Sequence, residues 1–294
     1  MNKTIAVILS VIMMVPIYAL AISDQDIRFT VHNFAYNTDT SNGVVNGTER
    51  DFNANNPSVN QVCIFCHTPH NAAPAIPLWN KTIDNSMTAQ YQLYTSSQTL
   101  TNTVKHNSSL SATGVSLLCL TCHDGKTAIN VLHNAKDSER DATDGNGDAI
   151  IDLGNGAVAT PLSIFAFAGA KYPSDIGASR DGSGRIIDPE YGYNLTDDHP
   201  IGFSYTAAQA DAPTKLHALS EVATLSSNTV RFYGSDNRVE CSSCHNPHVF
   251  YGYGRTGGAR VRLNRGETPE QLARTPFLVR DNIGSGLCLS CHIK

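Results

Sequence analysis

All eight cysteines of the sequence fall into pairs whose members are separated by two residues, and a histidine directly follows each pair. The four resulting motifs are Cys63/Cys66/His67, Cys119/Cys122/His123, Cys241/Cys244/His245 and Cys288/Cys291/His292. The pattern Cys-x-x-Cys-His is typical of a covalently attached haem c. The two thiols, one helical turn apart, reach one edge of the porphyrin, and the histidine ligates the iron from the proximal side.

Three other uses of paired cysteines explain the pattern less well. Disulfides of an exported protein do not need the adjacent histidine. A zinc site built from four thiolates does not need it either. Redox-active dithiols usually occur singly on a βαβ scaffold, for which this sequence shows no signal. We therefore predict four haem c groups, bound through the eight cysteines, with the four motif histidines as iron ligands.

The four motifs form an internal repeat. Residues 63–70 and 241–248 share the pattern C-x-x-C-H-x-P-H, and residues 116–123 and 285–292 share S-x-L-C-L-x-C-H. Such alternation indicates a duplicated unit. The predicted organisation is a first dihaem module at 22–133, a connecting segment rich in glycine and aspartate at 134–198, and a second dihaem module at 199–294.

Each predicted module contains two further histidines that could supply the second axial ligands of its irons. They are His32 and His70 in the first module, and His199 and His248 in the second. Residues three apart on a helical turn lie on the same side of it, about 5–6 Å apart. His70 therefore cannot reach the opposite face of the haem that His67 serves. We expect His70, and likewise His248, to bind a different iron; the alternative is a surface histidine beside a turn.

Three histidines lie outside this set of eight. His106, His133 and His217 are expected to be surface residues, although any of them could replace a member of the set. His133 is the first candidate for such a replacement.

The composition predicts few regular elements around these motifs. Only 16% of the residues are charged, 41% are hydrophobic, and long helical periodicity is scarce. We therefore expect a multihaem cytochrome c fold, mostly irregular, with short α-helices and few strands wrapped around a chain of four haems. The net charge of −5 provides no basic surface for nucleic acid.

The N-terminus has the pattern of a secretory signal peptide. Lys3 precedes an apolar run that contains Pro16 and ends in Ala19-Leu20-Ala21. A run of this length favours cleavage after residue 21 over a membrane span. Residues 1–21 therefore predict an exported protein with no membrane span. The resemblance described below implies that its destination is the cell surface or the extracellular space, with the periplasm as the alternative.

The connecting segment contains a partial match to a calcium-binding loop. Asp144, Asn146, Asp148 and Asp152 occupy template positions 1, 3, 5 and 9. Ala149 stands where the template has glycine, and Asn155 stands where it has a bidentate glutamate. Calcium at these four residues and an ordinary solvated loop are both open interpretations.

Taken together, the string H…CxxCHTPHNA…PLW…SLLCLTCHDG…DHPIGF…CSSCHNPH…FL…LCLSCHIK resembles multihaem c-type cytochromes and covers most of the chain. Within them it is most similar to the OmcE-type tetrahaem cytochromes of metal-reducing bacteria, which polymerise into extracellular filaments. The resemblance implies that every haem has two histidine ligands. It also implies that one distal ligand crosses from a neighbouring subunit, and His32, on an N-terminal arm, is the candidate for that ligand.

These observations predict an electron carrier and not an enzyme. If every iron has two histidine ligands, no coordination position is open for a substrate. The expected partners are further copies of the chain in a filament, redox-partner cytochromes and an extracellular acceptor such as a metal oxide. Alternatives are a periplasmic tetrahaem shuttle, a multihaem reductase, which needs an open iron, and a zinc-stapled adhesion protein.

Overall fold

The computed structural model describes residues 27, 32–36, 54–70, 72, 78–83, 88–89, 91–94, 100–111, 113–124, 127–153, 160–161, 179–180, 186–188, 194–196, 198–249, 253–256, 259–262 and 277–294. The predicted signal peptide at 1–21 and much of the connecting segment lie outside these residues.

The helices are short. They are η3 (Val62–Phe65), α1 (Asn102–Asn107), α2 (Val115–His123), α4 (Tyr205–Asp211), α5 (Leu219–Leu225), α6 (Cys241–Cys244), η6 (Ile283–Ser285) and α8 (Cys288–Cys291). Side-chain caps start two of them, because Thr101 Oγ1 accepts from the amide of Val104 and Ser204 Oγ accepts from the amide of Ala207, at 3.3 Å each. Helices this short depend on tertiary packing for their stability.

The strands are shorter still and form small separate sheets. They are β1 (Gln92–Leu93), β2 (Val131–Leu132), β3 (Ala142–Thr143), β4 (Ala149–Ile150), β5 (Ser179–Arg180), β6 (Ile186–Asp188), β7 (Asn194–Leu195), β8 (Phe203–Ser204), β9 (Arg238–Val239), β10 (Tyr253–Thr256) and β11 (Ala259–Arg262). One antiparallel sheet has the order β2-β4-β3, and the pairs β5-β6, β8-β9 and β10-β11 are also antiparallel. β1 pairs with β7 in parallel.

The two modules that the repeat predicts are packed into one another. Helix α1 contacts α4 and helix α2 contacts α6, and in both pairs the first helix belongs to the first module and the second helix to the second. Strand β1 of the first module pairs with β7, which lies near the end of the connecting segment. One hydrophobic cluster combines Val104 of the first module with Phe203, Val222 and Leu287 of the second. The sequence repeat therefore does not correspond to two separately packed units.

A second cluster of buried side chains supports the first attachment motif. Ile64 and Phe65, the last residues of η3, pack with Ile129, Leu132 and Ile151 from the segment that follows α2. Phe65 is 1% exposed. The apolar residues inside this attachment turn thus anchor it, while Cys63 remains exposed and Cys66 partly exposed.

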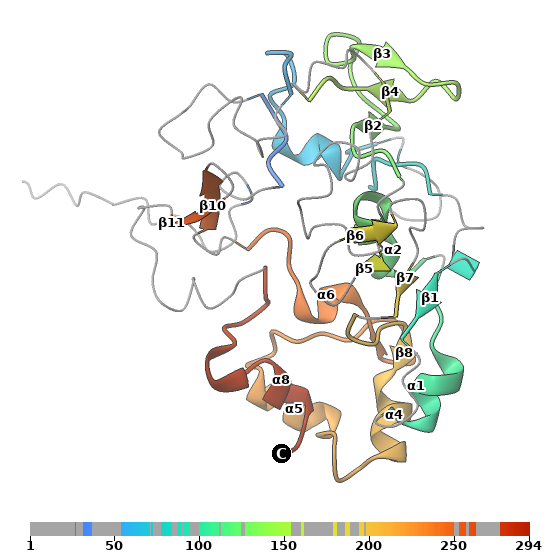
Figure 1. The fold of residues 1–294 in the computed structure, drawn as a ribbon, viewed down its shortest axis with the longest axis vertical. Helices are drawn as coiled ribbons and strands as arrows, with labels where there is room; N and C mark the ends of the chain where they lie inside the picture. Colours follow the sequence, from blue (N-terminus) through green and yellow to red (C-terminus); the bar gives the residue numbers. More distant parts are fainter. Residues whose placement is uncertain are drawn as a thin grey trace, which may run out of the picture.

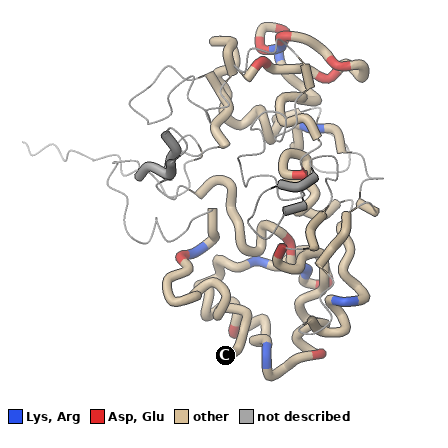
Figure 2. The backbone as a smooth tube through the Cα atoms, in the orientation of Figure 1, with Lys and Arg blue, Asp and Glu red and all other residues tan. Residues whose placement is uncertain are grey.

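The attachment motifs follow one another along the long axis of the molecule. In Figure 1 the light-blue turn η3 lies uppermost, followed by α2, α6 and finally α8 near the C-terminus. Charged residues are sparse, and Figure 2 shows several acidic residues near the β3–β4 hairpin at the top. Among the helices in the described part of the chain, none is long and apolar enough to cross a membrane.

Candidate functional site

Each of the four cysteine pairs lies on a single helical turn. The first pair lies on or directly after η3, the second lies on α2, and the third and fourth form the ends of α6 and α8. In three motifs the histidine amide donates to the carbonyl of the first cysteine: His67 to Cys63 at 2.7 Å, His245 to Cys241 at 3.0 Å and His292 to Cys288 at 2.9 Å. This geometry places both thiols of a pair side by side, with the histidine at the C-terminal end of the turn.

A strand-like segment runs antiparallel to two of the attachment turns. Beside the first, Thr68 N donates to Leu78 O and Asn80 N donates to Cys66 O, both at 2.9 Å. The second module repeats the arrangement: Asn246 N donates to Phe277 O at 2.7 Å and Val279 N to Cys244 O at 2.9 Å. Single β-bridges, His67 to Trp79 and His245 to Leu278, complete both pairings.

The pairing of these flanking segments with the turns was not predicted from the sequence. Leu78 and Phe277, at equivalent positions, have φ angles of 67° and 57°, which side-chain-bearing residues rarely adopt. Strain of this kind persists only where surrounding contacts hold it. The sequence signal for the two equivalent segments was a proline followed by two large apolar residues, Pro-Leu-Trp at 77–79 and Pro-Phe-Leu at 276–278. The two segments lie at different sequence distances from their cysteine motifs, so the repeat did not align them.

Three motif histidines each face one histidine from elsewhere in the chain. The ring centroids of His32 and His123 are 6.0 Å apart. Those of His67 and His248 are 6.3 Å apart, with the planes within 13° of parallel, and those of His199 and His292 are also 6.3 Å apart. Every pair thus combines one predicted proximal ligand with one predicted distal ligand.

This separation suits a single iron between the two rings. A metal–imidazole bond is about 2.0–2.1 Å long and the bonded nitrogen lies about 1.1 Å from its ring centre, so two imidazoles on opposite sides of one metal have centroids about 6 Å apart. The donor set of paired thiols with two facing imidazoles therefore fits bis-histidine haem c at three of the four motifs.

Hydrogen bonds orient two of the distal rings. His199 Nδ1 lies 2.9 Å from the carbonyl oxygen of Pro200, and His248 Nδ1 lies 3.0 Å from Asn246 Oδ1. Because both partners are acceptors, Nδ1 carries the proton and donates it. The lone pair then resides on Nε2, which is the nitrogen left to ligate a metal.

Burial keeps several of these imidazoles neutral, which is the form that binds a metal. It lowers the pKa of His32 to about 3, with a further lowering by His123, although a backbone hydrogen bond at Pro247 acts in the opposite direction. Burial is also the first cause of the lowered pKa values of His248 and His292, and the facing ring of each pair adds to it. Burial therefore favours the neutral imidazole over the imidazolium form at His32, His248 and His292.

His32, which the resemblance suggested as a ligand for a neighbouring subunit, lies beside a motif histidine of its own chain in this structure. Its ring faces His123 of the same chain and lies 4.6 Å from the ring of Phe277, centroid to centroid. Aromatic contacts with the C-terminal part of the chain hold this segment inside the molecule, so His32 is a ligand candidate within its own chain.

The pairing also crosses the predicted module boundary. His248 belongs to the second module by sequence, but its ring faces His67 of the first. His248 therefore approaches a different iron from the one assigned to His245, as its position three residues after His245 leads us to expect. The equivalent His70 is exposed, and its carbonyl oxygen accepts from Thr68 Oγ1 at 2.7 Å.

Of the three histidines outside the set, one is exposed and two are partly buried beside carboxylates. His106 is exposed near the end of α1. His133 Nδ1 lies 3.2 Å from Asp148 Oδ1, and His217 Nδ1 lies 3.5 Å from Glu221 Oε2. Their contacts with carboxylates account for His133 and His217 without a metal.

Cysteines of successive motifs are neighbours in space. Cys119 and Cys241 share a hydrogen bond. This bond and burial raise the pKa of Cys119, and the same bond is the main cause of the lowered pKa of Cys241. Burial raises the pKa of Cys66 to about 12, and the neighbouring Cys122 adds to this rise. Burial likewise raises the pKa of Cys244 to about 12, with Cys291 contributing. The attachment points therefore form one row in chain order.

The same thiols are poor candidates for the alternative chemistries. All eight cysteines are free thiols, so no disulfide joins them. At Cys66, Cys119, Cys122, Cys244 and Cys291 the raised pKa opposes the thiolate form that zinc requires, whereas the pKa of Cys241 is lowered. Within the described residues, no group of three or more histidine, cysteine or acidic side chains has a geometry that could hold a metal ion by itself.

The predicted calcium residues make other contacts. Asp144 Oδ1 accepts from the amides of Asn146 and Asp148 at 2.8 and 2.9 Å, which closes the turn between β3 and β4. Asp148 Oδ2 accepts from Thr82 Oγ1 at 2.9 Å, and Asp152 is directed toward the Asn55 side chain. These contacts explain the loop as a folded hairpin, and calcium binding there stays a prediction.

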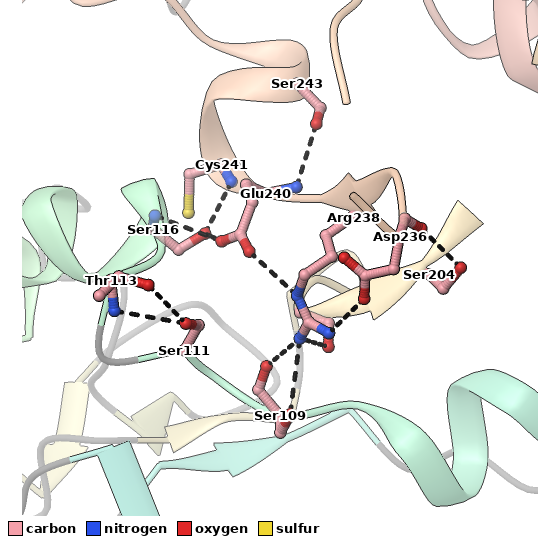
Figure 3. Close-up of polar contacts among 11 residues, drawn as sticks. Ser109, Ser111, Thr113, Ser116, Ser204, Asp236, Arg238, Glu240, Cys241 and Ser243 are labelled. Carbon is pink, nitrogen blue, oxygen red and sulfur yellow. Dashed lines mark hydrogen bonds and ion pairs between the residues drawn. The ribbon is translucent and has the colours of Figure 1, made fainter. Parts of the chain in front are cut away.

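A buried polar cluster joins α2 to α6 between the second and third attachment motifs (Figure 3). Glu240, 2% exposed, accepts from the amide and the hydroxyl of Ser116. Ser116 Oγ in turn accepts from Cys241 N at 2.9 Å. Arg238 Nε lies 3.5 Å from Glu240 Oε1, and the Arg238 guanidinium also donates to the carbonyls of Ser109 and Gly202. This Ser116–Glu240–Arg238 cluster therefore holds Cys241 against α2.

Comparison with known protein families finds no matching family, and comparison with well-characterised individual proteins finds no significant match.

Proposed function

We propose that this protein is an exported tetrahaem c-type cytochrome that carries electrons between closely spaced bis-histidine haems. The observation that carries the proposal is the set of three histidine pairs with ring centroids 6.0–6.3 Å apart, each joining a Cys-x-x-Cys-His histidine to a distant one. Haem iron supplies one-electron redox chemistry when it is bound. The polypeptide supplies its spacing, its ligands and its insulation.

The side chains have separate roles in this function. The eight cysteines attach the cofactors, so that little protein is needed to retain them. The facing imidazoles close both axial positions, which favours electron transfer over substrate binding. Nδ1–H hydrogen bonds at His199 and His248 hold the distal rings in place and increase the basicity of the ligating nitrogen.

The row of cysteines implies the order of the electron path. Cys66 neighbours Cys122, Cys119 is hydrogen-bonded to Cys241, and Cys244 neighbours Cys291. Successive attachment edges therefore face one another in the order of the motifs along the chain. The Ser116–Glu240–Arg238 cluster maintains the middle junction, where the two halves of the sequence meet.

Purified protein tests the proposal directly. We expect four haems per chain by absorbance and intact mass, a low-spin spectrum after reduction, and no binding of carbon monoxide, because both axial positions are taken. A colourless protein would refute the haem assignment and favour the zinc-stapled alternative. Substantial carbon monoxide binding would instead show an open iron, as a reductase requires.

We further propose that the chain polymerises into an extracellular filament, with a soluble periplasmic shuttle as the alternative. Three histidine pairs account for six of the eight assigned ligands, which leaves His70 to serve the iron of His245. His70 is exposed and is therefore accessible to another copy. A ligand donated from one copy to the next makes a heterologous contact, which generates open polymers when it does not close into a ring.

Electron microscopy of His70→Ala tests this assignment. We expect filaments from the unaltered protein and small discrete particles from the variant, because the ligand between copies is lost. His106→Ala, which alters an exposed histidine outside the ligand set, serves as the matched control and should form filaments. Filaments of normal length from His70→Ala would exclude His70 as the link, and discrete particles from the unaltered protein would favour the shuttle.

A further inference from the structure

Lys81 is a buried lysine whose contacts are all neutral. The residue is 3% exposed, and its Nζ lies 3.2 Å from the carbonyl oxygen of Ala128, 2.9 Å from that of Ile129 and 2.9 Å from that of Val131. An ammonium group has exactly three N–H donors and no acceptor. Three carbonyl acceptors therefore match the protonated form, and the structure keeps a positive charge in the interior.

The charge lies between the first two attachment motifs. Lys81 directly follows Asn80, whose amide donates to Cys66 O and whose side chain donates to Ile64 O at 2.6 Å. Its three acceptors belong to the segment that leaves α2, the helix that carries the second cysteine pair. Lys81 thus connects the first attachment turn with the chain that follows the second.

The thiols on both sides are close enough to respond to this charge. Burial raises the pKa values of Cys66 and Cys122, and Lys81 opposes the rise at each of them. Asp124 acts in the other direction at Cys122, but with a smaller effect than Lys81. The positive charge of Lys81 therefore affects Cys122 more strongly than the negative charge of Asp124 does, at the place where the first two cofactors would be attached.

The second module has a cation at the equivalent position. Lys81 stands two residues after Trp79, which bridges to His67, and Arg280 stands two residues after Leu278, which bridges to His245. Arg280 Nη1 donates to Ser290 Oγ at 3.0 Å, within the fourth motif, and to the carbonyl of Leu225. Unlike Lys81, Arg280 is partly exposed. Each module therefore links its two motifs through a cation, but only the first buries it.

We propose that Lys81 positions the first two haems and raises their reduction potentials relative to the second two. A buried positive charge favours the reduced iron, whose charge is lower by one, and burial limits screening of this interaction by water and salt. Arg280, being partly exposed, exerts a weaker effect on the second pair. The haem chain is consequently polarised, with reducing equivalents favoured at its N-terminal half. This inference rests on the proposed haem content.

A redox titration of Lys81→Gln, followed by absorbance, tests the inference. Glutamine keeps N–H donors but removes the charge. We expect two of the four haems to shift to more negative potential, with about a tenfold lower ratio of reduced to oxidised haem at a fixed potential, which is about 59 mV for a one-electron centre. Lys81→Arg should leave the potentials near those of the unaltered protein. Lys136→Gln, at a side chain that is 68% exposed, should also leave them unchanged.

The outcomes separate this inference from the proposed function. Four haems with unchanged potentials in Lys81→Gln would overturn the role of Lys81 alone, even if urea unfolding showed a loss of stability, because a purely structural lysine changes stability without changing potential. A chain without haem would overturn both proposals. If Lys81→Gln does not fold, the titration of the unaltered protein decides: two haems with higher potentials than the other two support the inference, and four haems with the same potential overturn it.

Discussion

Replacing His199 with alanine is expected to open one iron in four to carbon monoxide. The His199 ring faces His292 at 6.3 Å, and its Nδ1 donates to the carbonyl of Pro200, so Nε2 is available as the sixth ligand of that iron. His199 is exposed, so its removal should cost little packing. Carbon monoxide binding to the reduced protein should rise from none to about one molecule per four haems, with a matching fraction of high-spin absorbance.

The control for this experiment is His106→Ala, which removes an exposed histidine outside the ligand set and should bind no carbon monoxide. An unchanged spectrum in His199→Ala, without carbon monoxide binding, would remove His199 from the ligand set. His248→Ala extends the test to the pair that crosses the module boundary, because loss of that ring should open the iron of His67.

Replacing Glu240 with alanine is expected to destabilise the protein by about 3–5 kcal/mol, since it removes the buried one of the two carboxylates that pair with the largely buried Arg238. Glu240 is 2% exposed, and its carboxylate accepts from the amide and hydroxyl of Ser116 as well as facing Arg238. Domains are stable by only about 5–15 kcal/mol in total. Urea unfolding at neutral pH measures the loss.

Asp236→Ala is the matched control, because Asp236 pairs with the same arginine at 3.1 Å but is 48% exposed. Exposed ion pairs contribute about 0–1 kcal/mol, so this variant should unfold close to the unaltered protein. Equal unfolding midpoints for the two variants would show that burial of Glu240 does not strengthen its contribution. If Glu240→Ala does not fold, Glu240→Gln, which keeps an acceptor for Ser116, should still unfold earlier than the control.

The effect of Glu240 on function follows from its position. The cluster holds Cys241 through the hydroxyl of Ser116, and Cys241 is hydrogen-bonded to Cys119 of the preceding motif. Loss of the carboxylate therefore loosens the junction at which electrons would pass between the two halves of the chain. Gly114, the residue directly before α2, allows the start of this helix to lie close to Glu240, because a Cβ at position 114 would be only 3.3 Å from Glu240 Oε1.

Local spacing was sufficient to predict that each cysteine pair lies on one helical turn. Cysteines three residues apart were expected on one helical turn, and all four pairs lie on such turns. The described residues do form short helices, together with eleven strands of two to four residues, while the predicted wrapping of the chain around four haems stays a prediction. These predictions succeed because they concern residues that are close in the chain, where helical geometry alone sets the distances.

Long-range partners could not be predicted in this way. The repeat suggested that each module would use its own spare histidines, but His248 faces His67 across the boundary, and His32 lies inside the chain beside His123 instead of extending from it. Similarly, no pattern identified Lys81, because its role depends on carbonyl groups of residues 128–131, which look the same in every sequence.

By itself, the sequence determined which residues form the four attachment turns and which histidines make up the candidate ligand set, since covalent spacing and residue type are encoded locally. Only the tertiary structure decided which rings face each other, in what order the turns follow one another, and where the buried charges of Lys81 and Glu240 lie. Those features depend on how segments far apart in the chain pack, and packing is settled by the burial and hydrogen bonding of the whole molecule.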